Sequence, residues 1–143
     1  MAESAEHQVR AAIDGIAAAI RAKDVDAVMA HYAPEVIAFD LLPPLQYRGA
    51  AKIRERLSRW LSSFQDAIGF EMRELAITAG DDVAFCHSLN RVSGRTRDGA
   101  VIDMWWRATN GFRRIAGRWV VTHGHSSEPF DMQSGKALTD LKP

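Results

Sequence analysis

The second half of the chain, from Gly69 onward, alternates strand-forming runs with short turn segments, and this pattern constrains the fold more than any other feature. Four runs have the composition of strands: 70–79, 83–94, 100–112 and 118–126. Three short segments between them each contain the glycine that tight hairpins favour: 80–82, 97–99 and 115–117. The sequence therefore predicts a long antiparallel meander.

The first half of the chain has helical periodicity instead. One helix is predicted at about 3–22, a shorter one at 24–32 before Pro34, and a third at about 50–64. Their apolar residues recur at helical spacing: Val9, Ile13, Ile16 and Ile20 in the first helix, and Ile53, Leu57, Trp60, Leu61 and Phe64 in the third. The run 36–40 has the composition of a strand. Helices followed by strands predict an α+β fold, in which the N-terminal helices pack on one face of a curved antiparallel sheet.

Length and composition indicate one globular domain. The chain has 143 residues, 47% of them hydrophobic and 25% charged, which is not typical of a disordered or coiled-coil protein. We divide the single domain, residues 1–143, into three helices at about 3–64, a β-meander at about 70–127 and a tail at 128–143. The 18 basic and 18 acidic side chains balance, so we expect neither nucleic acid nor an anionic membrane as a partner. Because no targeting or membrane-spanning segment is visible and Cys86 is the single cysteine, we expect a cytoplasmic location.

Two histidines, His123 and His125, lie two residues apart on the last predicted strand. Side chains at this spacing point to the same face of a sheet, about 7 Å apart. If segment 115–117 forms a three-residue loop, Thr109 lies opposite His123 and Arg107 lies opposite His125. The four side chains then form one polar patch, with two indole rings as its walls: Trp105 and Trp119. The other face is apolar enough to cover helices or a partner subunit: Met104, Trp106, Ala108, Phe112 and Val120.

Several interpretations of this patch remain open. A four-residue loop would reverse the pairing and bring Trp106 beside the histidines. Arg107 can hold a carboxylate or an enolate oxygen, and a neutral histidine can act as an acid or a base near pH 7. The same residues could instead form a hydrogen-bond ladder that fixes the sheet register. A zinc or iron site with Asp40 or His87 as third ligand is a further alternative, but the Arg107 cation opposes it, and we expect no metal.

Five short motifs occur in characteristic order along the chain: Lys23-Asp24-Val25-Asp26, Tyr32-Ala33-Pro34-Glu35-Val36, Phe39-Asp40, Tyr47-Arg48-Gly49 and Gly117-Arg118-Trp119. By these motifs nearly the whole chain, from about Val9 to Asp131, resembles the SnoaL-like, ketosteroid-isomerase-related proteins of the nuclear-transport-factor-2-like superfamily. It implies a cone, in which a bent sheet wraps a long helix around a mostly apolar pocket for a small organic ligand. It does not fix the reaction, because the family includes isomerases, cyclases, dehydratases, epoxide hydrolases and binding domains.

The resemblance also implies roles for individual residues. The match of the helix-to-strand hinge places Asp40 at the position of the isomerase general base, where apolar neighbours favour a raised pKa. The alternative is a structural aspartate at the end of the strand that caps the loop from Leu41 to Pro44. The two oxyanion donors of the true steroid isomerases are not matched, because Ile16 stands at one position and Thr109 falls near the other. Asp103 lies six residues away from the second position. We therefore do not expect a true ketosteroid isomerase.

These observations lead to one main functional hypothesis and two alternatives. We expect a cofactor-free enzyme that moves a proton next to a carbonyl of a largely apolar substrate, as an isomerase, cyclase or dehydratase does. Asp40 and His123 are the expected catalytic residues. Seven others are expected to contact the substrate: Arg107, Thr109, His125, Trp105, Trp60, Tyr47 and His87. The alternatives are a ligand-binding module without catalysis and an assembly domain, and in every case we expect a homodimer through the sheet face. The enzyme hypothesis requires that Asp40 and the imidazoles share one cavity.

Overall fold

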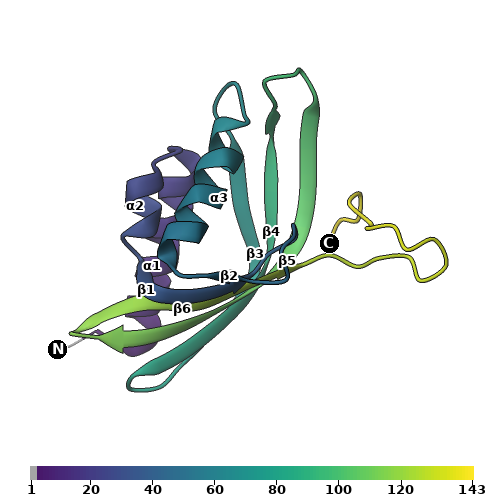
Figure 1. Ribbon diagram of the computed structural model, residues 1–143. Coiled ribbons are helices and arrows are strands. Elements are labelled where there is room, and N and C mark those ends of the chain that lie inside the picture. The colour runs from purple at the N-terminus through teal and green to yellow at the C-terminus, as the bar shows by residue number, and fades with distance from the viewer. Residues whose placement is uncertain (1–2) are drawn as a thin grey trace.

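The computed structural model describes residues 3–143 and confirms the predicted α+β class. Three helices and six strands follow one another along the chain: α1 (Ala5–Arg21), α2 (Val25–Met29), β1 (Tyr32–Phe39), β2 (Tyr47–Arg48), α3 (Ala50–Ser62), β3 (Gly69–Ala79), β4 (Val83–Arg95), β5 (Val101–Ile115) and β6 (Arg118–Ser127). The helices lie on one side of a strongly curved sheet, and the tail after β6 extends away from it (Figure 1). Among residues 3–143, no helix combines the length and hydropathy that a membrane span needs.

The six strands form one sheet in the order β2-β1-β6-β5-β4-β3. All neighbouring strands are antiparallel except β1 and β6, which run parallel. Strand β1 is second in this order and β6 is third, so the first and last strands of the chain lie side by side within the sheet. This arrangement brings Phe39, at the end of β1, into register with His125 on β6.

Packing against the helices defines an inner and an outer face of the sheet. On the inner face, Phe112 and Val121 are buried against Val9 and Ile13 of α1. A second buried cluster joins α1, α2 and α3 to the sheet: Ala17, Ile20, Val28, Leu61, Phe64, Phe70 and Val92. Because successive strand residues alternate between faces, the neighbours of these core residues point to the outer face.

Strand β1 begins earlier than the sequence indicated. The prediction that residues 24–32 form a helix ended by Pro34 is wrong at its end, because the helix stops at Met29 and β1 begins at Tyr32. Pro34 lies within the strand, where the register between β1 and β6 shifts between Tyr32 and Ile37. A proline is tolerated at such an irregularity, since no ladder hydrogen bond from its nitrogen is needed.

The hairpin between β5 and β6 also differs from the prediction. The loop has two residues, Ala116 and Gly117, both with positive φ (51° and 78°), so the three-residue loop and the pairing derived from it are wrong. A bulge follows, because Phe112 pairs with Val121 whereas Gly111 pairs with His123. The two differences shift the register by two residues, which preserves the face on which each β5 side chain lies.

The bulge reverses the alternation of side chains along β6. Trp119 and Val121, before the bulge, point to the inner face, whereas His123 and His125, after it, point to the outer face. Thr109 pairs with His125 and Arg107 pairs with Ser127, so the predicted polar side chains do share one face. Trp119 does not join them as a wall. It is buried in the α1 cluster on the inner face, where its indole N–H donates a 2.9 Å hydrogen bond to Oε1 of Gln8.

Truncation of Phe112 tests the importance of the α1 cluster. Phe112→Ala leaves a cavity among fully buried side chains and should lower the free energy of unfolding by about 3–5 kcal/mol. The control is Leu45→Ala, at a side chain that is 97% exposed. It should change the free energy of unfolding by less than about 0.5 kcal/mol. Urea unfolding monitored by circular dichroism measures both. Equal effects of the two substitutions would contradict the described core.

Candidate functional site

Asp40 immediately follows β1 and forms an ion pair with α3. Its Oδ2 atom lies 3.1 Å from Nε of Arg56, and the two side chains are 25% and 18% exposed. Its other oxygen, Oδ1, accepts a 2.6 Å hydrogen bond from the backbone N–H of Leu41. The Nε–H of Arg56 is not aimed at the carboxylate, so this enclosed atom has no hydrogen-bond partner within residues 3–143. The pair therefore holds the carboxylate on the helix side while leaving one buried donor free.

Tyr32, at the start of β1, lies within electrostatic reach of the same carboxylate. Its side chain is partly buried between the two core clusters, and desolvation of its hydroxyl, together with the charge of Asp40, raises its pKa to about 12. A tyrosine hydroxyl is already protonated near neutral pH, and the shift widens that margin, so Tyr32 is a neutral hydrogen-bond donor. The inner side of β1 thus combines a carboxylate, a guanidinium and a protonated phenol.

Two neighbouring open depressions lie between α3 and the loop 41–46, and we refer to them together as the two-lobed cleft. One lobe, of about 510 Å³, we call the aromatic lobe; it is lined by Leu42, Pro43, Tyr47, Arg56, Arg59, Trp60 and Ser63. The other, of about 480 Å³, we call the cationic lobe; it is lined by Pro43, Pro44, Gln46, Tyr47, Arg48, Lys52, Glu55 and Arg59. The lobes share three wall residues: Pro43, Tyr47 and Arg59. Arg56 connects Asp40 to this cleft, because it pairs with the carboxylate and lines the aromatic lobe.

Two aromatic residues predicted to contact a ligand, Tyr47 and Trp60, do line the cleft. The buried Tyr47 donates a 2.9 Å hydrogen bond from its hydroxyl to the carbonyl of Pro43, which fixes the loop against the sheet. Trp60 makes edge-on contacts with Phe64 and Trp106 at centroid distances of 6.1 and 6.3 Å. These contacts fix the orientation of the indole ring in the wall of the aromatic lobe. The hydroxyl of Tyr47 is used within the loop rather than aimed at Asp40.

The two histidines of β6 lie on the other side of β1. The ring of Phe39, which is 38% exposed on the outer face, contacts His123 at 4.8 Å and His125 at 5.3 Å between centroids. Nδ1 of His123 lies 2.7 Å from the carbonyl oxygen of Ile37, so this ring is held by the β1 backbone. Asp40 turns towards α3, whereas its neighbour Phe39 turns towards the imidazoles. The expectation that Asp40 and the histidines share one cavity is therefore wrong.

The other predicted polar residues also lie on the outer face. The register places His87, Thr109, His125 and Phe39 side by side in one row across β4, β5, β6 and β1. In the next row, Nε of Arg107 donates a 3.1 Å hydrogen bond to Oγ of Ser127. Within residues 3–143, no three His, Cys, Asp or Glu side chains are arranged to hold a metal ion.

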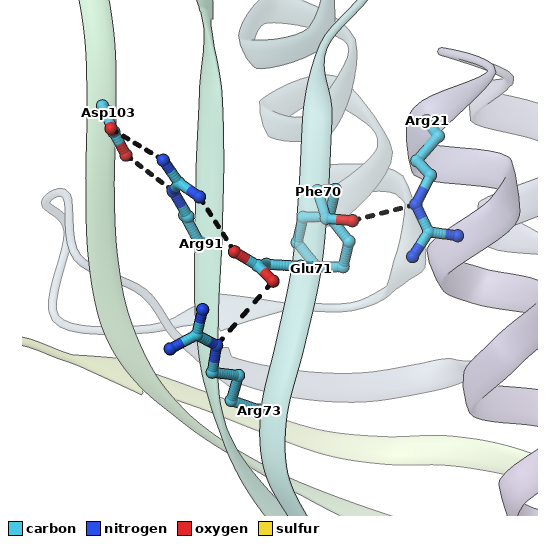
Figure 2. A network of polar contacts seen from close by, with 6 residues as sticks. All are labelled: Arg21, Phe70, Glu71, Arg73, Arg91 and Asp103. Atoms are coloured by element: carbon cyan, nitrogen blue, oxygen red, sulfur yellow. Dashed lines mark hydrogen bonds and ion pairs between the residues drawn. The ribbon is translucent and has the colours of Figure 1, made fainter. Parts of the chain in front are cut away.

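Trp105 belongs to a charged network on this outer face rather than to a ligand pocket. Figure 2 shows Arg91 between Asp103 and Glu71, with hydrogen bonds of 2.8 and 2.9 Å to the former and 3.0 Å to the latter. These bonds raise the pKa of Arg91 and lower that of Asp103. The ring of Trp105 packs under the guanidinium groups of Arg73 and Arg91, at 4.9 and 5.8 Å. Both carboxylate oxygens of Asp103 thus accept hydrogen bonds from Arg91 on the outer face, and Asp103 does not point to the inner face as an oxyanion donor would.

Sequence reasoning missed Arg56, Tyr32 and Glu128. A usable signal existed for Arg56, because it precedes Trp60 by four residues and so lies on the same helix face. The sequence pattern predicted Tyr32 at the end of a helix, whereas it begins the strand that leads to Asp40. No sequence signal marked Glu128, which follows the last strand.

Glu128 is an acid in an enclosed position. Its Oε1 atom has no hydrogen-bond partner within residues 3–143, and burial raises the pKa of the carboxyl group. Ser126 pairs with the buried Ala108, so alternation along the strand places Ser126 and Glu128 on the inner face. The folded protein therefore binds the Glu128 proton more tightly than the unfolded chain does.

This shift has a defined effect on stability. The ionised carboxylate is disfavoured in the folded state, so it lowers stability above the unfolded-state pKa, and the penalty disappears as the pH falls. We expect Glu128→Gln to raise the melting temperature at about pH 8 and to give no gain at about pH 4. Glu35→Gln, at an exposed position, serves as the control and should have no effect at either pH. A pH-independent effect of Glu128→Gln in differential scanning calorimetry would contradict the shift.

Comparisons with known proteins agree with this architecture. A family model described as a SnoaL-like domain matches residues 9–131. An NTF2-like protein of unknown function from Pseudomonas putida is 35% identical, with a TM-score of 0.89, over 100% of this chain and 99% of that chain. A ketosteroid isomerase-like protein from Erwinia carotovora is 19% identical, with a TM-score of 0.75, over 88% of this chain and 97% of that one. An NTF2-like superfamily protein from Salmonella enterica is 17% identical, with a TM-score of 0.78, over 93% and 96%. None of the curated proteins that we compared matches the chain.

Proposed function

Because this chain belongs to the SnoaL-like domain family, we propose that it binds a small organic molecule in the two-lobed cleft and moves a proton next to a carbonyl group of that molecule. The observation that carries the proposal is the ion pair between Asp40 and Arg56. It links the carboxylate that the family resemblance marks as a base to the wall of the aromatic lobe. The reaction as proposed needs no cofactor.

The inner-face residues have complementary roles in such a reaction. Asp40 removes a proton from the carbon next to the carbonyl, and the electron pair of the broken C–H bond moves into an enolate. The enolate oxygen accepts a hydrogen bond from the guanidinium group of Arg56, which lines the aromatic lobe. Tyr32 is a neutral donor within electrostatic reach of the carboxylate. In an isomerisation of a β,γ-unsaturated carbonyl compound, the proton held by Asp40 returns to the γ carbon of the dienolate. In a cyclisation, the enolate carbon attacks a second carbonyl group, and Asp40 gives its proton to the alkoxide oxygen that forms. His123 has no part in this scheme, because it lies on the outer face.

A non-catalytic binding module is the second candidate function. The cleft is open to solvent along α3, and an enzyme that handles an enolate gains from excluding water. The same cleft can therefore serve ligand capture alone. Isotope exchange separates the two functions, because binding by itself moves no proton.

Deuterium incorporation tests the proposed reaction without knowledge of the product. Carbonyl compounds that raise the melting temperature in a thermal-shift screen are incubated with the protein in D₂O, and mass spectrometry reports deuterium at the carbon next to the carbonyl. We expect exchange with the natural sequence and a rate at least about 100-fold lower with Asp40→Asn. Asp140→Asn, at an exposed position in the tail, is the control and should exchange normally. Undiminished exchange in Asp40→Asn would refute its role as base, and stable binding without any exchange would favour the binding module.

We also propose that a second copy of the chain covers the outer face. Large apolar side chains on this face are exposed: Phe39, Val83, Phe85 and Val101. Phe85 is 49% exposed, and it pairs with Gly111, next to the row of His87, Thr109 and His125. These side chains extend over the sheet face, from Val83 at one end of the β4–β5 pairing to Val101 at the other, and a second subunit that covers the face would bury them.

Light scattering tests the proposed dimer. The protein should be a dimer at micromolar concentration, and Phe85→Asp should make it a monomer, because the interface would bury an unpaired charge. Leu45→Asp introduces the same charge at an exposed position away from the sheet and should leave the dimer intact. A monomeric natural protein would contradict the proposal.

A further inference from the structure

We infer that the ligand of the two-lobed cleft is an amphipathic organic anion, with its apolar body in the aromatic lobe and its anionic group in the cationic lobe. This inference rests on the proposed function, since it names the chemical class that the same cleft takes. It follows from how charges and aromatic rings are divided between the two lobes.

The cationic lobe has more positive than negative charge. Three of its wall residues are basic and one is acidic. The acidic residue, Glu55, is already bonded to Arg59 one helical turn away, at 3.2 Å. Within residues 3–143, neither Arg48 nor Lys52 forms an ion pair. A ligand anion in this lobe would therefore meet two cations that no protein carboxylate neutralises.

The aromatic lobe has the opposite character. Its wall carries Leu42, Pro43, Tyr47 and the fixed indole of Trp60. Both arginines of this lobe are already paired, Arg56 with Asp40 at 3.1 Å and Arg59 with Glu55 at 3.2 Å, so the lobe offers apolar surface rather than a net charge. A ring system of the ligand is the group that such a surface accommodates.

The two lobes are adjacent, so one molecule can occupy both. Arg59, Tyr47 and Pro43 line each of them, and either lobe, at about 500 Å³, has room for a small ring system or its substituent. Arg59 stands at the junction, where its guanidinium can contact the bond between ring and anion. A neutral ligand would leave Arg48 and Lys52 without a partner, which is why an anionic group favours binding.

A matched pair of probes tests this inference. Isothermal titration calorimetry compares 2-naphthoate, which carries a ring system and a carboxylate, with 2-naphthamide, its neutral isostere. A third probe, 2-naphthyl phosphate, carries the same ring system with a different anionic group. We expect both anions to bind at least about tenfold more tightly than the amide. The double variant Arg48→Gln/Lys52→Gln should lose this preference while retaining affinity for the amide. The control variant Arg54→Gln/Arg113→Gln removes two exposed arginines outside the cleft and should keep the preference.

Failure of this inference is distinguishable from failure of the proposed function. Equal affinities for acid and amide, both lost in Trp60→Ala, would overturn the anion preference but leave a ligand site in the cleft. The deuterium experiment would then still decide catalysis. If none of the three naphthalene probes binds the natural protein, or if the control variant loses the preference as fully as the double variant does, the assignment of the two lobes is overturned.

Discussion

The burial of Phe112 and Val121 against Val9 and Ile13 decides which side of the sheet can hold a ligand site. Once these side chains face the helices, strand alternation assigns every neighbour to one side or the other. Asp40 and Trp60 then lie on the side of the helices, whereas the histidines and the charged network around Arg91 lie on the outer face. The same packing therefore creates two surfaces of different chemistry on one sheet, and the proposed ligand site and the proposed subunit interface do not compete for residues.

Much of the fold could be predicted from local sequence patterns. Helical periodicity located α1 and α3, and turn glycines located the hairpins, because each of these signals acts within a few residues of its effect. The details that were wrong depend on longer-range packing. Thr122 is the extra residue of the β6 bulge, and nothing local marks it, since the bulge exists to reconcile Trp119 on the inner face with His123 on the outer face.

The candidate site shows the same division. Asp40, Tyr47 and Trp60 could be proposed from the sequence because the resemblance and the aromatic pattern marked them, and all three lie towards α3 and the loop that follows β1. Arg56 acquires its importance only through an ion pair across sixteen residues of loop and helix, which the sequence does not reveal. The family resemblance could not place His123, because the side on which it lies depends on a single inserted residue.

The bulge at Thr122 also separates two requirements that would otherwise conflict. Without the additional residue, a continuous alternation would point Trp119 and the histidines the same way, so that either an indole would face water or imidazoles would enter the apolar core. The inserted residue lets the first half of β6 be selected for contact with α1 and the second half for whatever lies against the outer surface. Substitutions can therefore accumulate on that outer surface, and new associations can arise there, without altering the packing that keeps the cone folded.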